Sequence, residues 1–586
     1  MLYSKLVEVY EQLDSTTKRL AYTSIISSFL KDIPVADLSL TLLLLEGRIF
    51  PRWDEREIGV ASKLVVKALN LASGEDTKKI ENEWKKTGDL GSVAFNLFQK
   101  RKQATLHFQT LTVAKVMKNL RELATIQGLG TVDKKLQLIA ELLTSSTAIE
   151  AKFIARTILN DLRVGVGEGT LRDSIVWAYF GSEIGVSYDE KEKAISIPDR
   201  EVYNRYVDAV QRAYDLNNEF GPVAEIAKTK GIKGLLHITL TIGTPVKVML
   251  ALKVETLSDG FERCGKPAAF EYKYDGMRIQ IHKDNDSITL YTRRLENVTY
   301  QFPDVVKHVK EYVHEKKVVL DAEAVGYSKT TGHYLPFQQI SQRIQRKYDI
   351  ESMAEQFPVE VNVFDIIYYK DKEVFDQTYQ ERRKIIERII EKKPKKITVA
   401  QSIITGDENK AASFYQEALA SGNEGLMIKK LDAPYVPGAR VGYMVKLKPT
   451  KENLDLVIVK AEWGEGKRSK WLSSYTLACR DEKGSLLELG KASTGLKEKS
   501  EEGLSFDDMT ELLRPLIIKE EGKEAIIKPK LVIEIAYEEI QKSPTYSSGY
   551  ALRFPRVIQV RCDRGINDIT ELSMVEKMFN GQVKIR

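Results

Sequence analysis

The segment AFEYKYDGMRIQIH occupies residues 269–282, close to the middle of the chain. Two alternating runs inside it, Ala269–Tyr272 and Met277–His282, are predicted to form strands with a turn between them. Lys273 therefore lies at the end of a strand, where most lysines are solvated surface charges. An amine in this position becomes a nucleophile only if nearby cations or burial remove its proton. Other segments of the chain are therefore needed to distinguish a surface charge from a nucleophile.

Length and composition limit the class of protein. A chain of 586 residues is too long for one hydrophobic core, so three or four domains are expected. Apolar residues make up 43% and charged residues 29%, which is typical of a globular protein. The net charge of +6 permits a polyanionic partner but does not by itself predict one.

The targeting and cysteine patterns favour an intracellular protein. The apolar run Leu38–Leu45 is too short to span a bilayer, and Met1–Leu30 carries charges throughout, unlike a secretory signal. Cys264, Cys479 and Cys562 are widely separated, which argues against a disulfide framework and against a structural zinc site. We expect a protein of the cytoplasm or nucleoid with no membrane association.

The pattern of predicted secondary structure changes twice along the chain. Residues 1–235 carry apolar side chains at helical spacing, which predicts an all-α domain. Between residues 240 and 449, strand-like runs alternate with helical ones, which predicts an α+β domain. Residues 450–586 contain short strand candidates and one helix, which suits a β OB-fold. Those strand candidates are Asp455–Ala461, Ser474–Arg480, Leu486–Lys491, Leu531–Ile535 and Arg556–Val560.

The hexapeptide KYDGMR at Lys273–Arg278 resembles the K-x-D-G-x-R signature of the covalent nucleotidyltransferases, namely DNA ligases, RNA ligases and mRNA capping enzymes. Seven further segments resemble that family's motifs in the same order. They are Tyr291–Arg294, Leu320–Glu323, Val363–Asp365, Gly422–Lys429, Tyr443–Pro449, Arg553–Arg556 and Arg561–Arg564. Each alone has an ordinary explanation as a solvated carboxylate, a core aromatic or a charged edge strand. Together they resemble ATP-dependent DNA ligases of the archaeal and eukaryotic replicative type, over the whole chain.

The resemblance implies a helical DNA-binding domain at 1–235, a nucleotidyltransferase (adenylation) domain at 240–449 and an OB-fold domain at 450–586. The glycine-rich loop Leu162–Gly167 resembles a loop that contacts the duplex backbone in this family, although plain helix caps explain the same glycines. The resemblance makes Lys273 the catalytic nucleophile. The implied cofactor-binding residues are Glu271, Arg278, Arg293, Glu323, Phe364, Arg440, Lys446 and Lys448. The implied metal ligands are Glu323 and Glu424, and the implied motif VI residues are Arg553, Arg556 and Asp563.

The resemblance also assigns roles. Glu271 occupies the adenine-contact position, Phe364 stacks on the purine, and Glu323 receives the ribose hydroxyl. Lys446 and Lys448 bind phosphate oxygens, and we expect them to lower the pKa of Lys273 from about 10.4 towards about 7 to 8.

Three positions depart from the family pattern. Ala322 replaces a common glycine, and Tyr443 lies in a region where tryptophan is usual. Arg564 replaces a lysine, which leaves its role in orienting pyrophosphate open because a guanidinium lacks the compact geometry of an ammonium.

The implied activity is that of a DNA ligase, which seals nicks in duplex DNA during replication, repair and recombination. ATP would adenylate Lys273 with loss of pyrophosphate, AMP would pass to the 5′-phosphate, and the 3′-hydroxyl would displace AMP. Mg²⁺ is the expected metal, with Mn²⁺ as a substitute. We expect a monomer whose OB domain swings between a nucleotide-loading state and a DNA-encircling state.

Three other functions compete. An RNA ligase or capping enzyme is disfavoured by the long helical domain. An NAD⁺-dependent ligase is disfavoured because its cysteine cluster and extra C-terminal domains are missing. A non-catalytic binding protein with a decayed site is disfavoured because the key residues are intact. These are Lys273, Glu323, Glu424, Lys446 and Lys448.

The segment QATLHF at Gln103–Phe108 resembles a shortened sliding-clamp-binding box. Gln103, Leu106 and Phe108 would be its anchors. An amphipathic loop that packs against its own domain explains the segment equally well, and the sequence leaves both interpretations open.

Overall fold

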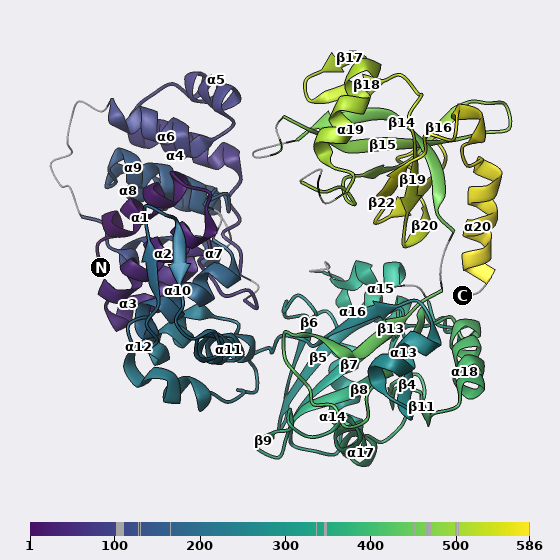
Figure 1. Ribbon diagram of the computed structural model, residues 1–586. Coiled ribbons are helices and arrows are strands. Elements are labelled where there is room, and N and C mark those ends of the chain that lie inside the picture. Colours follow the sequence, from purple (N-terminus) through teal and green to yellow (C-terminus); the bar gives the residue numbers. More distant parts are fainter. Residues whose placement is uncertain are drawn as a thin grey trace.

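The chain forms three regions, seen in a computed structural model (Figure 1). The structure describes residues 1–54, 56–100, 110–126, 128, 130–164, 166–335, 337–344, 348–449, 452–464, 468, 470–498, 501 and 503–584. In the view of Figure 1 the N-terminal helical region lies at the left, the central mixed region at the lower right and the C-terminal β-rich region at the upper right.

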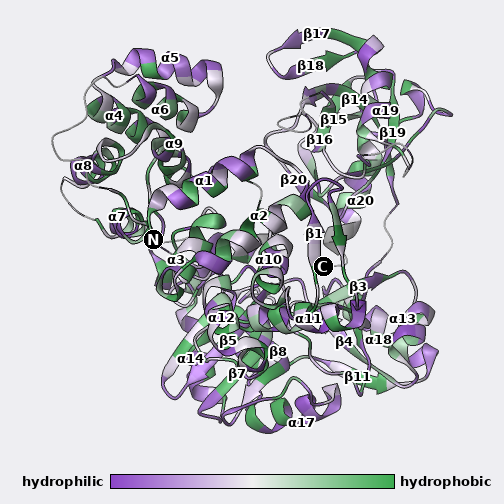
Figure 2. Cartoon of the chain, turned by 60° about the vertical axis from the view of Figure 1, so that its left-hand side comes forward, coloured by the Kyte–Doolittle hydropathy of each residue, from purple (hydrophilic) through white to green (hydrophobic). Residues whose placement is uncertain are grey.

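The N-terminal region is built from helices that pack on one hydrophobic core. They are α1 (Tyr3–Asp14), α2 (Arg19–Asp32), α3 (Val35–Leu45), α4 (Ser62–Ser73), α5 (Thr77–Thr87), α6 (Leu90–Gln99), α7 (Val113–Thr125), α8 (Thr131–Thr144), α9 (Ala148–Ile158), α10 (Glu168–Phe180), α11 (Arg200–Asn217) and α12 (Phe220–Leu236). Figure 2 shows that α5 is largely hydrophilic, and only its Ile80 is buried. The apolar run Leu38–Leu45 falls within α3, as predicted.

One feature of this region differs from the all-α prediction. Strands β1 (Ser187–Asp189) and β2 (Ala194–Ser196) form a small antiparallel hairpin between α10 and α11. Its strands have three residues each and are mostly exposed, so they lack the buried alternation by which a strand is recognised in a sequence.

The central region contains two sheets. The first has the strand order β11 (Ser402–Thr405), β4 (Ala268–Lys273), β12 (Gly425–Lys429), β13 (Arg440–Leu447) and β3 (Leu250–Val254). The second has the order β10 (Ile397–Val399), β8 (Val359–Tyr369), β7 (Lys317–Gly326), β5 (Met277–Asp284) and β6 (Ser287–Thr292), with β9 (Lys372–Glu373) paired to β8. The helices are α13 (Leu257–Cys264), α14 (Pro303–Tyr312), α15 (Phe337–Ile344), α16 (Ile350–Gln356), α17 (Tyr379–Ile389) and α18 (Glu408–Ala420).

The segment 269–282 joins the two sheets. Its two strands exist as predicted, but β4 belongs to the first sheet and β5 to the second. The chain passes from the first sheet to the second at Gly276, where an added Cβ would come within 2.5 Å of the Ala324 carbonyl oxygen. Only glycine permits this close approach, so Lys273 is held at the junction of the two sheets.

The C-terminal region is β-rich and OB-like. Its strands are β14 (Leu454–Trp463), β15 (Leu472–Arg480), β16 (Leu486–Ala492), β17 (Ile517–Glu521), β18 (Glu524–Ile527), β19 (Val532–Ala536), β20 (Glu539–Lys542), β21 (Tyr550–Arg553) and β22 (Arg556–Val560). They accompany α19 (Phe506–Leu513) and α20 (Leu572–Lys584). The five predicted strands and the predicted helix are present, and β17, β18, β20, β21 and α20 are additional. In β17 four of five residues are exposed, so its sequence has no alternation to reveal it.

The connection between the first two regions is hydrogen-bonded to β5. The backbone amide of Gly243 donates to His282 Nδ1 at 3.0 Å, and that of Val246 donates to Gln280 Oε1 at 2.7 Å. Arg212 on α11 also contacts Glu373 on β9 at 3.2 Å. These contacts hold the helical region against the second sheet. Among the described helices, none combines the length and hydropathy needed to cross a membrane.

Candidate active site

A cavity of about 1510 Å³ is lined by residues from all three regions. The N-terminal region contributes the loop around Arg52, and the C-terminal region contributes Glu538, Arg553 and Phe554. The central region contributes most of the wall. The predicted site residues in this wall are Glu271, Lys273, Arg278, Arg293, Glu323, Phe364, Glu424, Arg440, Lys446, Lys448 and Arg553. Among the predicted site residues, the folded chain brings together positions up to 282 apart, from Glu271 to Arg553.

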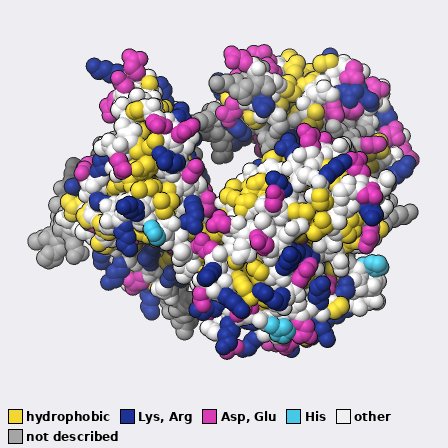
Figure 3. Space-filling view, turned by 60° about the horizontal axis from the view of Figure 1, so that its bottom comes forward, with side chains coloured by type: hydrophobic (Ala, Val, Ile, Leu, Met, Phe, Trp, Pro, Cys, Tyr) yellow, Lys and Arg dark blue, Asp and Glu magenta, His cyan; other side chains and the backbone are white. Residues whose placement is uncertain are grey.

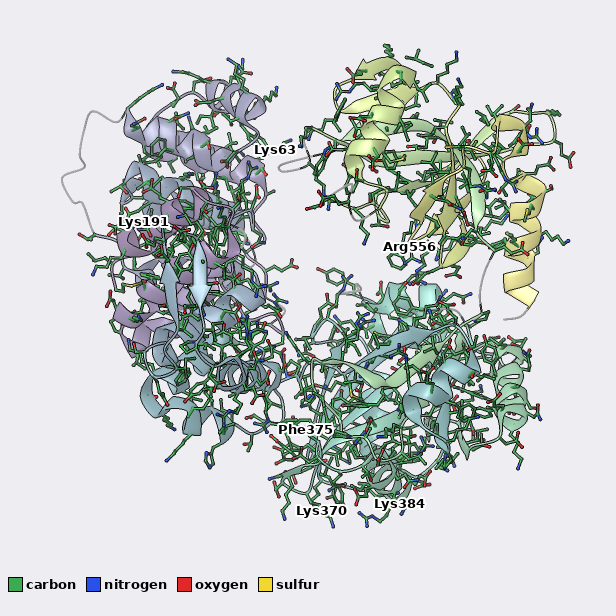
Figure 4. All side chains as sticks on the ribbon, in the orientation of Figure 1. Lys63, Lys191, Lys370, Phe375, Lys384 and Arg556 are labelled. Atoms are coloured by element: carbon green, nitrogen blue, oxygen red, sulfur yellow. The ribbon has the colours of Figure 1, made fainter. Side chains whose placement is uncertain are left out.

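Two predicted residues, Arg556 and Asp563, are not part of this wall. Figure 4 places Arg556 at the side of the C-terminal region that faces the central region. Asp563 pairs with Arg561 at 2.7 Å. Arg564, which replaces the family's lysine, has its Nε 3.1 Å from Asp455 and so contacts its own domain.

Lys273 forms an ion pair with a carboxylate from another strand end. Its Nζ is 2.6 Å from Glu424 Oε2, and the same oxygen is 2.6 Å from Lys448 Nζ. Burial lowers the pKa of Lys273, but the charges of Glu424, Glu323 and Asp275 outweigh burial and raise it above the usual value. This is opposite to the predicted direction, because the sequence showed the cations of the site but not how close its anions come.

Lys446 behaves differently from Lys273. Burial lowers its pKa, and the positive charges of Lys273 and Lys448 lower it further. The charge repulsion expected within the lysine cluster therefore acts on Lys446, whereas Lys273 is governed by its carboxylate partner.

The pKa values of the two predicted metal ligands, Glu323 and Glu424, shift in opposite directions. Burial raises the pKa of Glu323 to about 8, although Lys273 and Arg278 oppose it. Burial also acts to raise the pKa of Glu424, but Lys273 and Lys448 outweigh it and lower that pKa to about 2. No cluster of three or more His, Cys, Asp or Glu able to hold a metal occurs in the part of the chain that is described. Two carboxylates fit Mg²⁺, which commonly takes one or two protein carboxylates together with substrate phosphates.

An aromatic ring and a buried carboxylate also line the cavity. The Phe364 ring lies 5.3 Å from the Arg278 guanidinium and 5.1 Å from the Lys429 ammonium. Glu271 is 1% exposed, and its Oε2 is 2.5 Å from Lys429 Nζ. Sequence reasoning did not single out Lys429, although it ends the quoted segment Gly422–Lys429.

Arg278 is held by groups that sequence reasoning also missed. Its Nε and Nη2 donate to the two oxygens of Asp321 at 2.9 Å and 2.5 Å, and its Nη1 donates to the Met249 carbonyl at 2.9 Å. The Tyr435 hydroxyl donates to Asp321 at 2.9 Å. Asp321 lies within the quoted segment Leu320–Glu323, so its position next to the other motif residues was the available signal.

Comparison with known proteins shows three family models that match this chain. The family model described as ATP dependent DNA ligase domain matches residues 248–448, DNA ligase N terminus matches 2–176, and ATP dependent DNA ligase C terminal region matches 468–564. The solved structure Pmar-Lig_PreS3 has the same fold, with a TM-score of 0.52 and 16% identity over 95% of this chain and 99% of that one.

Full-length relatives are more similar in sequence. The DNA ligase of Nanoarchaeum equitans is 44% identical, with 99% of each chain covered. The DNA ligases of Thermococcus fumicolans and Archaeoglobus fulgidus are each 39% identical, with 100% of both chains covered. The chain belongs to the ATP-dependent DNA ligases of archaeal type, the enzymes that seal nicks in DNA.

Proposed function

We propose that Lys273 is the nucleophile that this DNA ligase uses to take AMP from ATP. Its nitrogen attacks the α-phosphorus, an N–P bond forms, and the bond to the leaving pyrophosphate breaks. The observation that carries the proposal is the position of Lys273 at the junction of two sheets, inside a cavity that also contains the phosphate-binding and base-binding candidates. Positioning and charge neutralisation are what phosphoryl transfer requires of a protein.

The amine must lose a proton before it attacks. Because Glu424 and Glu323 raise the pKa of Lys273, neutralising these carboxylates favours the reactive form. Lys446 and Lys448 bind the phosphate oxygens in this proposal. Glu323 and Glu424 would hold Mg²⁺, or Mn²⁺ in its place, which neutralises phosphate charge when bound.

Further residues of the cavity wall suit an adenosine. Phe364 would stack on the purine and Glu323 would receive the ribose hydroxyl, and Arg278 is adjacent to both, 5.3 Å from the Phe364 ring and opposite Glu323 in register. The Glu271 carboxylate accepts hydrogen bonds and the adjacent Lys429 ammonium donates them. This pair complements the edge of adenine, where an amino group lies beside the N1 acceptor. Arg293 and Arg440 are the remaining proposed nucleotide contacts.

The later steps involve DNA and the C-terminal region. We infer that nicked duplex DNA is the acceptor, that residues 1–235 contact its backbone, and that the boundaries near residues 240 and 450 separate moving domains. Arg553 would orient pyrophosphate during nucleotide loading, and Arg556 and Asp563 would act in another arrangement of the OB domain. On the face shown in Figure 3, basic side chains lie among acidic ones, so the modest net charge is not concentrated there.

The first test mixes the purified protein with Mg²⁺ and either ATP or NAD⁺, each labelled in its adenylate, and separates the products on a denaturing gel. We expect label on the protein from ATP alone, and none on Lys273→Ala. Transfer of the label to the 5′-phosphate of nicked duplex DNA then shows the second step. Equal labelling of the Lys273→Ala variant would contradict the assignment of the nucleophile.

We also propose a monomer that binds a sliding clamp through Gln103, Leu106 and Phe108. These residues lie outside those that the structure describes, so the proposal rests on the sequence of the segment.

A further inference from the structure

Helix α17 contacts both sheets of the central region through two adjacent arginines. Arg382 pairs with Asp365 on β8 of the second sheet, and Arg383 pairs with Glu271 on β4 of the first. The helix begins at a capping box formed by Thr378 and Glu381, which fixes its first turn. A single rigid helix thus connects two carboxylates that lie on separate sheets.

Glu271 is held from three directions. Its Oε1 accepts from the Tyr379 hydroxyl at 2.5 Å and from Arg383 Nη1 at 3.2 Å, and its Oε2 contacts Lys429 at 2.5 Å. Arg383 also donates to the Ala400 carbonyl at 2.6 Å, which fixes the guanidinium itself. A carboxylate has about four acceptor positions, so these residues leave about one for a ligand.

Asp365, which follows Phe364 in the chain, is also held by several hydrogen bonds. Arg382 donates to its two oxygens at 2.7 Å and 3.1 Å, and also to the carbonyls of Gln377 and Ala433. Both members of the pair are 2% exposed. Phe364 precedes Asp365 at a register shift between β7 and β8, and both residues line the cavity, so the Arg382–Asp365 pair anchors β8 directly beside the ring.

We propose that α17 determines nucleobase selectivity, with Tyr379 and Arg383 as positioning residues for Glu271. The proposal rests on the adenosine site proposed above. Adenine presents a donor at position 6 and an acceptor at N1, whereas hypoxanthine presents an acceptor and a donor at these positions. A carboxylate that cannot rotate or withdraw accepts from a 6-amino group and repels a 6-oxo group. Since α17 also pairs with the residue after Phe364, one helix anchors both the strand of the stacking ring and this carboxylate.

The experiment measures the covalent nucleotide adduct on the intact protein by mass spectrometry, with ATP or ITP at varied concentration and Mg²⁺ present. ITP is the probe because its base differs from adenine only at N1 and C6. The variants are Tyr379→Phe, which removes one hydroxyl, and Arg383→Met, which removes the charge. Lys384→Met is the matched control, because Lys384 is exposed on the same helix and lies at the outer edge of the molecule in Figure 4.

We expect each positioning variant to raise the ATP concentration for half-maximal rate of adduct formation (KM) about tenfold and to leave the maximal rate nearly unchanged. The rate of adduct formation with ITP should be unchanged or faster. The preference for ATP over ITP then falls at least tenfold, and Arg383→Lys restores part of it. Sealing of a nick that already carries the 5′-adenylate remains at the wild-type rate.

Equal loss with ATP and ITP in Tyr379→Phe, or slower sealing of the pre-adenylated nick, would overturn this inference. Tyr379→Phe keeps the test valid if Arg383→Met does not fold. Absence of any adduct on the wild-type protein with ATP would instead defeat the assignment of Lys273, so the two failures are distinguishable.

Discussion

The ammonium of Lys273 lies 2.6 Å from the carboxylate of Glu424, a residue 151 positions later in the chain. The proposed nucleophile and a proposed metal ligand are therefore direct charge partners. Hydrogen-bonded register supports this pairing, because Lys273 on β4 lies opposite Gly425 on β12. The protonation state of the Lys273 amine thus depends on the charge of Glu424.

The first prediction concerns that dependence. Glu424→Gln removes the main charge that raises the pKa of Lys273, so the pKa should fall. Labelling of Lys273 by an amine-specific reagent, measured across pH 7–10, should begin at lower pH than in the wild type. Adenylation should nevertheless be lost, because a proposed metal ligand is gone. Glu408→Gln, which breaks the exposed pair with Lys266, should leave the labelling profile unchanged. An unchanged profile in Glu424→Gln would contradict the prediction.

The second prediction concerns Arg278 and its partner. Asp321 is fully buried, so Asp321→Asn leaves the Arg278 guanidinium without its counter-charge. We expect the free energy of unfolding to fall by about 3 kcal/mol, together with a higher KM for ATP. Thermal denaturation and adduct formation measure the two effects. Asp286→Asn, which breaks an exposed pair with Lys310, should change stability far less because solvent screens this pair. Similar effects in the two variants would refute the argument.

The third prediction is a pH dependence of stability. Burial lowers the pKa of His282 to about 3 from an ordinary value of 6.5. Between these values the unfolded chain binds a proton that the folded chain does not, so stability falls as the pH drops below about 6.5. The contribution of His282 to this loss from pH 7.5 to 4.5 should be about 2 to 3 kcal/mol.

Comparison with His282→Asn isolates this contribution. The asparagine retains an acceptor for the Gly243 amide but does not titrate. The melting temperature of the variant should therefore fall less between pH 7.5 and 4.5 than that of the wild type. Parallel curves would show that His282 does not set the slope.

The fourth prediction concerns Arg553, which lines the cavity from the C-terminal region. Arg553→Ala should slow self-adenylation at least tenfold, because a charged contact to pyrophosphate is removed. Sealing of a pre-adenylated nick should change much less. Arg480→Ala is the control, since Arg480 pairs with Glu571 away from the cavity wall. A uniform slowing of both steps would argue against a role in nucleotide loading.

The fifth prediction concerns the sliding clamp. Replacing Leu106 and Phe108 with alanine should abolish stimulation by the clamp and leave basal nick sealing unaltered, because apolar anchors carry such contacts. A pull-down with the clamp and a sealing assay measure the two quantities. Undiminished clamp binding by the double variant would disprove the clamp-binding box.

Much of the architecture could be predicted from the sequence, because local rules determine it. Alternation predicted the strands at Ala269–Tyr272 and Met277–His282, which are β4 and β5 of the structure. Strands with little burial escaped, since β17 is mostly exposed and carries no apolar alternation. The helix α20 and the hairpin of β1 and β2 were missed as well.

The sequence by itself determined the family, the order of the regions and the set of candidate residues around Lys273, because chemistry of this kind requires particular residue types at fixed short spacings. Only the tertiary structure decided that β4 and β5 join different sheets, that Glu424 raises the pKa of Lys273, and that Arg383 supports Glu271 from 112 positions away. These relationships depend on burial and on distances between strands and helices that are remote in the chain. Spacing along a sequence carries no information on such distances.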